Sequence, residues 1–142
     1  MKKIAVLILI FVSTSVQASE YGGVPMKFFD LIISNKSVKA IDYLYSTNRW
    51  VDANSDTVIN LKTQLEGIEK LVGKYKFHEL ISENKVGSRY AHLIYLVGYE
   101  RQPLRFEIRV YKPGDEWHFQ GFSFDAELTD DITKEVNLDL IK

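Results

Sequence analysis

Three histidines come closer than any other residues of this sequence to the spacing of a chemical site. His78 and His92 lie in consecutive segments of alternating polar and apolar residues, and His118 lies in a later segment. If the chain turns at Lys85, His78 faces His92 on the neighbouring strand about 4.8 Å away, which is close enough for both to ligate one metal ion. His118 falls two strands further over and cannot join them. The competing interpretation is three histidines scattered over a sheet, because the pairing requires one particular strand register.

The sequence offers no recognisable catalytic constellation besides these residues. It has no Cys, no G-x-S-x-G turn that would present a nucleophilic serine, and no glycine-rich phosphate loop. Glu79 is the acid that we expect to point inward from its strand, and we assign it to the lining of a pocket. The sequence therefore predicts no catalytic residue and no cofactor.

Three amphipathic helices are predicted in the first half of the chain. The first begins near Pro25 and carries an apolar stripe of Met26, Phe29 and Ile33, with Phe28 and Ile32 beside them. The second follows Ser37, a residue suited to cap it. The third has the clearest period of three and four, defined by Val58, Leu61, Leu65, Ile68 and Val72. Ser55 or Asn54 is its candidate cap, and Gly73 ends it.

The apolar period changes from 3.6 to 2 after Gly73, which predicts strands. Short turns separate four such segments, approximately Lys74–Glu83, Arg89–Glu100, Leu104–Lys112 and Glu116–Ala126. Short connections make neighbouring strands antiparallel, so the segments form a meander. Pro113 and Gly114 fit the centre of a type II turn. Helices followed by such a meander predict an α+β fold with the helices packed on one face of a four-stranded sheet.

The last strand contains a break in its alternation. Trp117 and Phe119 share one parity, whereas Phe122 and Phe124 share the other. A β-bulge at Gly121 would bring all four rings to the inner face, because one extra residue resets the alternation. Bulges also bend a sheet, and a strongly bent sheet wrapped around a helix is a cone-shaped roll with a hollow interior.

The predicted chain has helices followed by long bent strands that end in YKPGDEWHFQGFSFD. This pattern resembles the nuclear transport factor 2-like superfamily, a group of α+β rolls, and in particular its small secreted bacterial members. The resemblance covers approximately Pro25 to Leu128. It implies a cone-shaped fold, an apolar pocket between sheet and helices, and dimers formed through the outer face of the sheet. The superfamily includes isomerases, dehydratases, cyclases and non-catalytic binding domains. The pocket tyrosine and two acids of its steroid isomerase branch do not match positions in this chain, so no catalytic residue carries over.

The aromatic content of the chain has two interpretations. The rings either line a ligand pocket or fill the core, which is the commoner use of aromatic side chains in a domain of this size. The candidate pocket-lining residues are Trp50, Glu79, Tyr95, Tyr99, Phe106, Trp117 and Phe119.

The second strand is apolar on both faces, which predicts a cover on its solvent side as well. Ile94 and Leu96 would lie on that outer face. The residues expected around them, rich in the Arg and Tyr that interfaces favour, are Arg105, Arg109, Tyr111 and Gln120. We therefore expect a homodimer through this face; the alternative is a central strand with two ordinary exposed aliphatic residues.

The N-terminus has the pattern of an export signal. Lys2 and Lys3 precede a short apolar segment, and Val16-Gln17-Ala18 supplies small residues where a signal peptidase cleaves. We predict a signal peptide at 1–18 with cleavage after Ala18, a single domain at 19–142, and a periplasmic or secreted location. The alternative is a retained membrane anchor, for which the apolar segment is short.

The charge of the chain argues against two classes of binding partner. With 18 Lys and Arg against 19 Asp and Glu, the net charge is −1, whereas nucleic-acid binding requires a basic face. The sequence also lacks a Lys- and Arg-rich amphipathic stretch for a membrane surface.

The predicted function is a non-catalytic binding or interaction module that holds a small apolar ligand in the cone or docks a protein partner through the sheet. One alternative is a small pocket enzyme of isomerase or hydrolase type, and another is an immunity or inhibitor protein for a secreted toxin. The side chains inside the cone distinguish the binding module from the pocket enzyme. A buried, unpaired acid facing a Tyr favours the enzyme, whereas a cone filled by Trp117, Phe119, Phe122 and Phe124 favours the module.

Overall fold

A computed structural model describes residues 20–128 of the chain. The predicted signal peptide at 1–18 lies outside these residues, and so does the tail after Leu128. The elements in chain order are a short 3-10 turn η1 (Glu20–Gly23), the helices α1 (Val24–Ile33), α2 (Ser37–Ser46) and α3 (Asp56–Val72), and the strands β1 (Tyr75–Val86), β2 (Tyr90–Tyr99), β3 (Pro103–Tyr111) and β4 (His118–Asp125). Within this part of the chain, no helix combines the length and the apolar character needed to cross a membrane.

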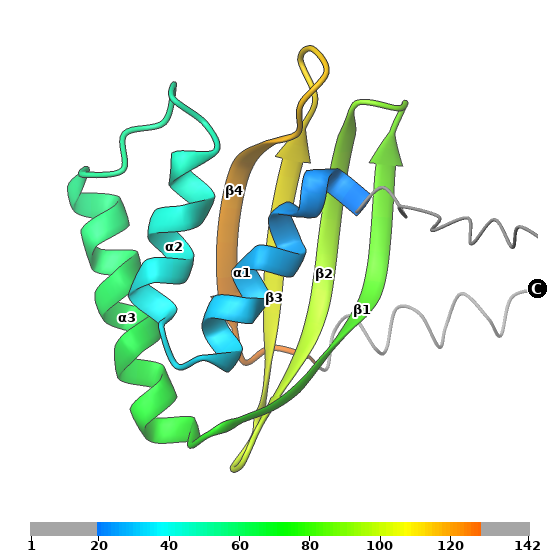
Figure 1. Ribbon diagram of the computed structural model, residues 1–142. Coiled ribbons are helices and arrows are strands. Elements are labelled where there is room, and N and C mark those ends of the chain that lie inside the picture. Colours follow the sequence, from blue (N-terminus) through cyan, green and yellow to red (C-terminus); the bar gives the residue numbers. More distant parts are fainter. Residues whose placement is uncertain (1–19, 129–142) are drawn as a thin grey trace, which may run out of the picture.

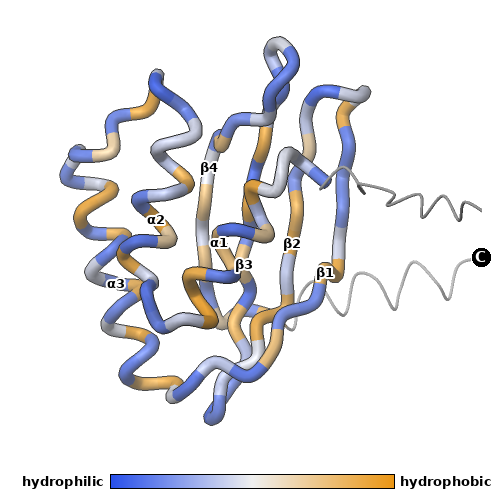
Figure 2. Tube along the Cα trace, viewed as in Figure 1, coloured by the Kyte–Doolittle hydropathy of each residue, from blue (hydrophilic) through white to orange (hydrophobic). Residues whose placement is uncertain are grey.

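The predicted α+β fold is confirmed. The four strands form one antiparallel sheet in the order β1-β2-β3-β4, which does not close on itself. Figure 1 shows all three helices on the same side of the sheet, with α1 lying across its middle and α2 and α3 toward β4. Polar and apolar residues alternate along the strands, as the colours of Figure 2 show. Because of this alternation, one face of the sheet packs against the helices. We call the opposite face of the sheet the outer face.

Helix α1 is rotated relative to the stripe that the sequence predicts. Val24, Phe28, Phe29 and Ile32 are buried, while Met26 and Ile33 are 60% and 53% exposed. The reason is that Phe28 and Phe29 both face the sheet, and the helix must turn Met26 and Ile33 toward solvent to bury two adjacent rings. The expectation that Met26 and Ile33 are core residues is wrong.

The termini of α3 agree with the prediction. The backbone N–H of Val58 donates to Oγ of Ser55, a cap that satisfies one of the free N–H groups of the first turn. Gly73 has a φ of +89°, which few other residues adopt, and ends the helix. Of the predicted stripe, the buried members are Val58, Leu65 and Val72, while Leu61 and Ile68 pack against the core from its edge.

Two of the predicted turns differ in the structure. The β1–β2 hairpin turns at Gly87, whose φ is +62°, and Val86 pairs with Tyr90, so β1 is longer than predicted and does not turn at Lys85. Gly114 is not among the left-handed glycines of the described chain, and a type II turn requires that conformation. The predicted type II turn at Pro113-Gly114 is therefore wrong, and a longer loop joins β3 to β4.

The bulge in β4 is present, but its extra residue lies one position before Gly121, the residue at which it was predicted. Arg109 pairs with Gly121, but the next residue, Val110, pairs with Phe119, which leaves Gln120 as the extra residue. Phe119 and Phe122 consequently point to the same side of the sheet, although they are three residues apart. Phe119 is 1% exposed and Phe122 is 8% exposed, and Trp117 and Phe124 pack against the same core.

Helix α2 and the following loop hold the bulged strand. The side-chain Nδ2 of the buried Asn48 donates to the backbone O of Phe119 (2.7 Å), and the Phe119 N–H donates to Oγ1 of Thr47 (3.0 Å). The ring of Phe119 also packs on Tyr45, with 4.7 Å between ring centroids. These contacts attach the end of α2 to β4 beside the bulge.

Aromatic rings fill the space between α1 and the sheet. The centroid of Phe28 lies 5.2 Å from that of Phe29 and 5.2 Å from that of Phe122, and Phe106 lies 5.4 Å from Phe122 at 89°. Edge-to-face and tilted packing of this kind is the favourable geometry for ring pairs. The interior of the predicted cone is therefore packed with side chains.

Candidate functional site

The residues expected to line a central pocket are mostly core residues. Tyr95, Tyr99, Phe106 and Phe119 are buried among the rings that fill the interior. Trp50 lies in the loop between α2 and α3, is 79% exposed, and has the guanidinium of Arg49 over its ring at 4.7 Å. The structure does not bring these residues together around one cavity. Tyr99 and Trp117 do line pockets, but these lie at opposite ends of the sheet.

The inward orientation expected for Glu79 is wrong. Glu79 is exposed and pairs with Leu96, which lies on the outer face between the buried residues Tyr95 and Val97. The parity of β1 could not be followed along the strand, because its register shifts twice, between Tyr75 and Phe77 and again between Leu80 and Ser82. Each shift exchanges the two faces for the residues beyond it.

The conditional pairing of His78 with His92 does not form, which agrees with the competing interpretation of histidines scattered over the sheet. His78 pairs with Val97 on the inner face, where its ring stacks on Phe29 at 3.8 Å and its Nδ1 is hydrogen-bonded to the hydroxyl of Tyr75 (2.6 Å). Burial lowers the pKa of His78, against a smaller opposing effect of Asp30. His92 lies on the outer face. Histidines on opposite faces of one sheet cannot share a metal ion, and within residues 20–128 no three His, Asp or Glu side chains gather as metal ligands do.

The structure reveals a half-buried acid, Glu69, that the sequence analysis missed. It lies on α3, where Ser37 Oγ donates to its Oε2 (2.7 Å) and the Tyr99 hydroxyl lies 3.5 Å from its Oε1. The sequence does contain an indication of this acid. Glu69 lies four residues after Leu65 and three before Val72, so it is an acid on the apolar stripe of α3. Burial raises the pKa of Glu69, although its bonds from Ser37 and Tyr99 act in the opposite direction.

Glu69 lies in the wall of a pocket between the helices and one end of the sheet. The pocket measures about 340 Å³, and its other lining residues include Ile32, Asn35, Tyr75 and Glu100. Ser37 is the first residue of α2, not its cap, and the residue before it, Lys36, makes no capping bond with its side chain. Because both of its oxygens have donors from neighbouring elements, Glu69 connects α2, α3 and β2 and does not match the unpaired acid that an enzyme would require.

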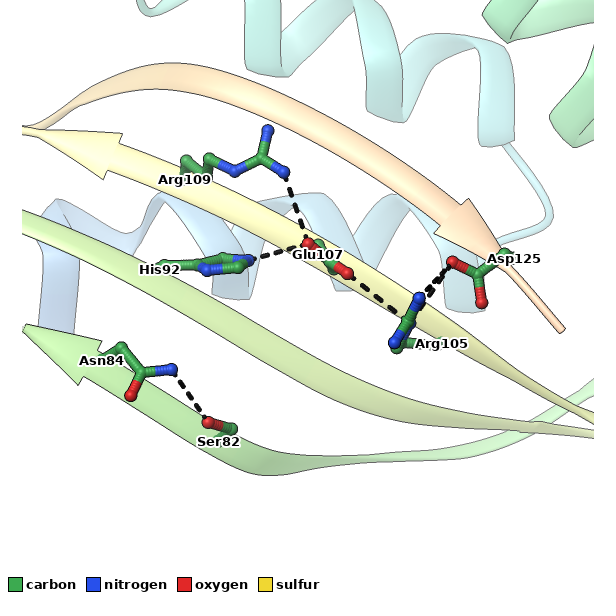
Figure 3. Close-up of polar contacts among 7 residues, drawn as sticks. All are labelled: Ser82, Asn84, His92, Arg105, Glu107, Arg109 and Asp125. Carbon is green, nitrogen blue, oxygen red and sulfur yellow. Dashed lines mark hydrogen bonds and ion pairs between the residues drawn. The ribbon is translucent and has the colours of Figure 1, made fainter. Parts of the chain in front are cut away.

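The outer face carries a connected group of charged side chains centred on Glu107 of β3 (Figure 3). Its Oε2 is hydrogen-bonded to Nε2 of His92 (2.8 Å) and accepts from Arg109 (3.3 Å), and its Oε1 lies 3.5 Å from Nε of Arg105. Arg105 also pairs with Asp125 of β4 at 2.7 Å. We call these five residues the Glu107 network.

The residues expected at an interface are partly brought together. Ile94 and Leu96 lie half-buried on the outer face of β2, directly beside Arg105 and Glu107 of the network. Tyr111 lies at the end of β3, opposite Tyr90 and His118. Gln120 is the extra residue of the bulge and takes no place in the cross-strand pairing. The outer face has a second aromatic residue that was not expected there, Phe77, whose ring covers Gly98.

We predict that Glu69→Gln changes how stability depends on pH. The pKa of Glu69 is raised in the folded state. The stability that this shift contributes is therefore fully present below the pKa of Glu69 in the unfolded chain, about 4.5, and is lost as the pH rises through the pKa in the folded state. The variant cannot ionise, so its free energy of unfolding relative to the wild type should be higher at pH 7 than at pH 4.5. Urea unfolding at both pH values measures this difference.

Glu66→Gln, one turn earlier on α3 and lining the same pocket, removes a carboxylate whose charge is the smallest contribution to the raised pKa of Glu69, so it should change the pH dependence of stability less than Glu69→Gln does. An equal pH dependence of stability in the wild type and in Glu69→Gln would contradict the assignment.

Comparison with known proteins identifies no relative of this chain. No family model, no curated protein and no solved structure matches it. The resemblance to the nuclear transport factor 2-like superfamily thus stays a prediction from the residue pattern, and the function has to be argued from the geometry of the chain itself.

Proposed function

We propose that the chain is a secreted, non-catalytic interaction module that docks through the outer face of its sheet, and that the partner on this face is a second copy of the chain. One observation carries the proposal. The inner face is filled by helices and rings, while the outer face presents Ile94 and Leu96 beside the Glu107 network with no described element covering them. A sheet strand that is apolar on both sides is stable when both sides are covered.

Strand pairing arranges the outer face in rows that run across the sheet. Each row contains one residue from each strand, in the order β1, β2, β3, β4. The three rows are Glu79–Leu96–Arg105–Asp125, Ser82–Ile94–Glu107–Ser123 and Asn84–His92–Arg109–Gly121.

These rows are self-complementary about a two-fold axis that runs along β2. Rotation about such an axis places β1 of one copy over β3 of the other, while β2 faces β2. Leu96 then meets Leu96 and Ile94 meets Ile94 at the centre, and Glu79 of each copy comes opposite Arg105 of the other. Two sheets packed face to face lie about 10 Å apart, a separation that side chains of this length can span.

The Glu107 network makes the outer face suitable for a copy of itself. Glu107 contacts Arg105, Arg109 and His92, and Arg105 contacts Asp125, so the charges are largely neutralised within the face. A face of this kind has no strong field of one sign to attract a polyanion or a polycation. Glu79, in contrast, is an exposed carboxylate on β1, and it is free to add an ion pair across the interface without breaking the network.

The alternatives have less support. The enzyme alternative depends on an unpaired pocket acid, and Glu69 has hydrogen-bond donors for both of its oxygens. The immunity or inhibitor alternative has no contact or surface in the described chain that favours it over self-association.

We predict that residues 19–142 form a dimer and that Leu96→Arg converts it to a monomer. The substitution places two like charges against each other at the centre of the interface, where Leu96 meets its own copy. Multi-angle light scattering over a range of protein concentrations measures the mass. Glu79→Lys should weaken the dimer less, because it opposes Arg105 at the rim.

Ile59→Arg is the matched control, since Ile59 is an aliphatic residue that is 49% exposed on α3, away from the outer face. This variant should remain a dimer. A wild-type protein that stays monomeric at high concentration, or a dimer that Ile59→Arg disrupts as much as Leu96→Arg does, would overturn the proposal.

Export is tested separately. Expressed with its full N-terminus in a bacterial host, the protein should be recovered from the periplasm with a mass that lacks residues 1–18. Ala18→Arg should block cleavage, because a signal peptidase requires a small residue at this position, whereas Gln17→Glu should be tolerated. Intact protein of full mass in the cytoplasmic fraction would contradict secretion.

A further inference from the structure

His92 lies on β2, the strand along which the two-fold axis of the proposed dimer runs. Its row across the outer face is Asn84–His92–Arg109–Gly121, next to the row of Ile94. Rotation about this axis keeps each row at its own level, so His92 of one copy meets His92 of the other, as Ile94 meets Ile94. Histidine is the side chain that ordinarily changes its charge between pH 8 and pH 5. The centre of the interface therefore contains a pair of groups that can become positive together.

The charged groups that face His92 within its own chain come from β3. The helices lie on the other side of the sheet, so β1 and β3 are the described elements that flank His92 (Figure 1). On β1 its neighbour is the neutral Asn84, and on β3 its neighbour is Arg109. Its Nε2 is hydrogen-bonded to Oε2 of Glu107 (2.8 Å), and Arg109 donates to the same oxygen (3.3 Å).

The contact of His92 with Glu107 does not by itself favour the monomer or the dimer. It lies within one chain (Figure 3), so it is present on both sides of the association equilibrium. Only contacts that differ between the two states can shift this equilibrium. The effect of a proton on His92 is therefore decided by the groups that the second copy brings.

The second copy brings positive groups closest to His92. The imidazole of the other His92 comes directly opposite, and Arg109 of the other copy lies over Asn84, one strand away. Glu107 of the other copy is one strand and one row away, and its charge is already shared with its own Arg109. Protonation of both His92 rings consequently places like charges against each other in a partly desolvated contact.

The remaining acids of the outer face are too far away to compensate this repulsion. Glu79 and Asp125 belong to the row of Leu96, four residues from His92 along β2, which is about 13 Å. This distance exceeds the Debye length of about 8 Å at physiological ionic strength. Both acids also have Arg105 as their closer partner, Asp125 within the chain and Glu79 across the dimer.

We infer that the dimer through the outer face is pH-sensitive, and that protonation of His92 dissociates it below about pH 6. The inference rests on the dimer proposed above and adds the condition under which the two copies separate. The monomer binds protons on His92 more readily than the dimer does, because only in the dimer does the charged ring meet a second one. Association therefore weakens as the pH falls.

The experiment measures the dimer dissociation constant of residues 19–142 at pH 7.5 and at pH 5.5 by sedimentation equilibrium. The constant of the wild type should rise about 10-fold or more at pH 5.5, because like charges that face each other in an interface are costly. The readout for each variant is the ratio of its own two constants, so a change in its affinity at pH 7.5 does not enter.

Three variants identify the group that titrates. His92→Gln cannot acquire a charge and should bring the ratio close to 1. His92→Lys carries a permanent charge and should give a weak dimer at both pH values. His118→Gln is the matched control, because His118 lies on β4, which the second copy does not cover, and this variant should keep the wild-type ratio. His78 on the inner face is present in all of them, so its titration cannot account for a difference.

The outcomes separate this inference from the dimer itself. A wild-type dimer that is equally tight at both pH values, a His92→Gln variant with the wild-type ratio, or a His118→Gln variant that loses it would overturn the pH dependence and leave the dimer in place. So would a His92→Lys dimer as tight as the wild type at pH 7.5. A wild type that is monomeric at pH 7.5 would refute the dimer, and the pH dependence with it.

Discussion

The structure depends on one constraint, which is that two rings three residues apart in β4 must face the same side of the sheet. A regular strand would turn either Phe119 or Phe122 to the outer face, because its side chains alternate. The extra residue Gln120 removes this conflict, and both rings are buried. Full burial of an aromatic side chain contributes about 1.5–3 kcal/mol, so two rings account for a large part of the net stability expected for a small domain. The backbone of Phe119 is in turn bonded to Thr47 and Asn48, which fixes the end of α2 against the sheet.

This constraint determines where function can lie. The rings of β4 and α1 fill the interior between the helices and the sheet, and the two open pockets described above lie at opposite ends of the sheet. The surface with unusual chemistry is the outer face with the Glu107 network. The proposed interaction module rests on this arrangement, a packed interior with charged and apolar groups on the outer face.

The sequence was sufficient for the fold class, the order of the elements and the bulge, since these follow from local period and parity. It was insufficient for the register of β1, because the register depends on the turn at Gly87 and on two irregularities inside the strand that leave no mark in the alternation. The error at Glu79 follows from that register, and so does the absence of the conditional pairing of His78 with His92. Trp50 was misjudged for another reason: aromatic composition does not distinguish a core ring from an exposed loop ring. Glu69 was detectable as an acid on an apolar stripe.

The most direct test of the central claim is the free energy of unfolding of two single variants, Phe119→Ala and Phe122→Ala, measured in urea beside Gln120→Ala. The account predicts a loss of about 3–5 kcal/mol for each Phe variant, because both rings are in the core, and a change within about 0.5 kcal/mol for Gln120→Ala, whose side chain is exposed. A loss below about 1 kcal/mol for either Phe variant would show that this ring lies on the solvent side of a regular strand, and would contradict the account.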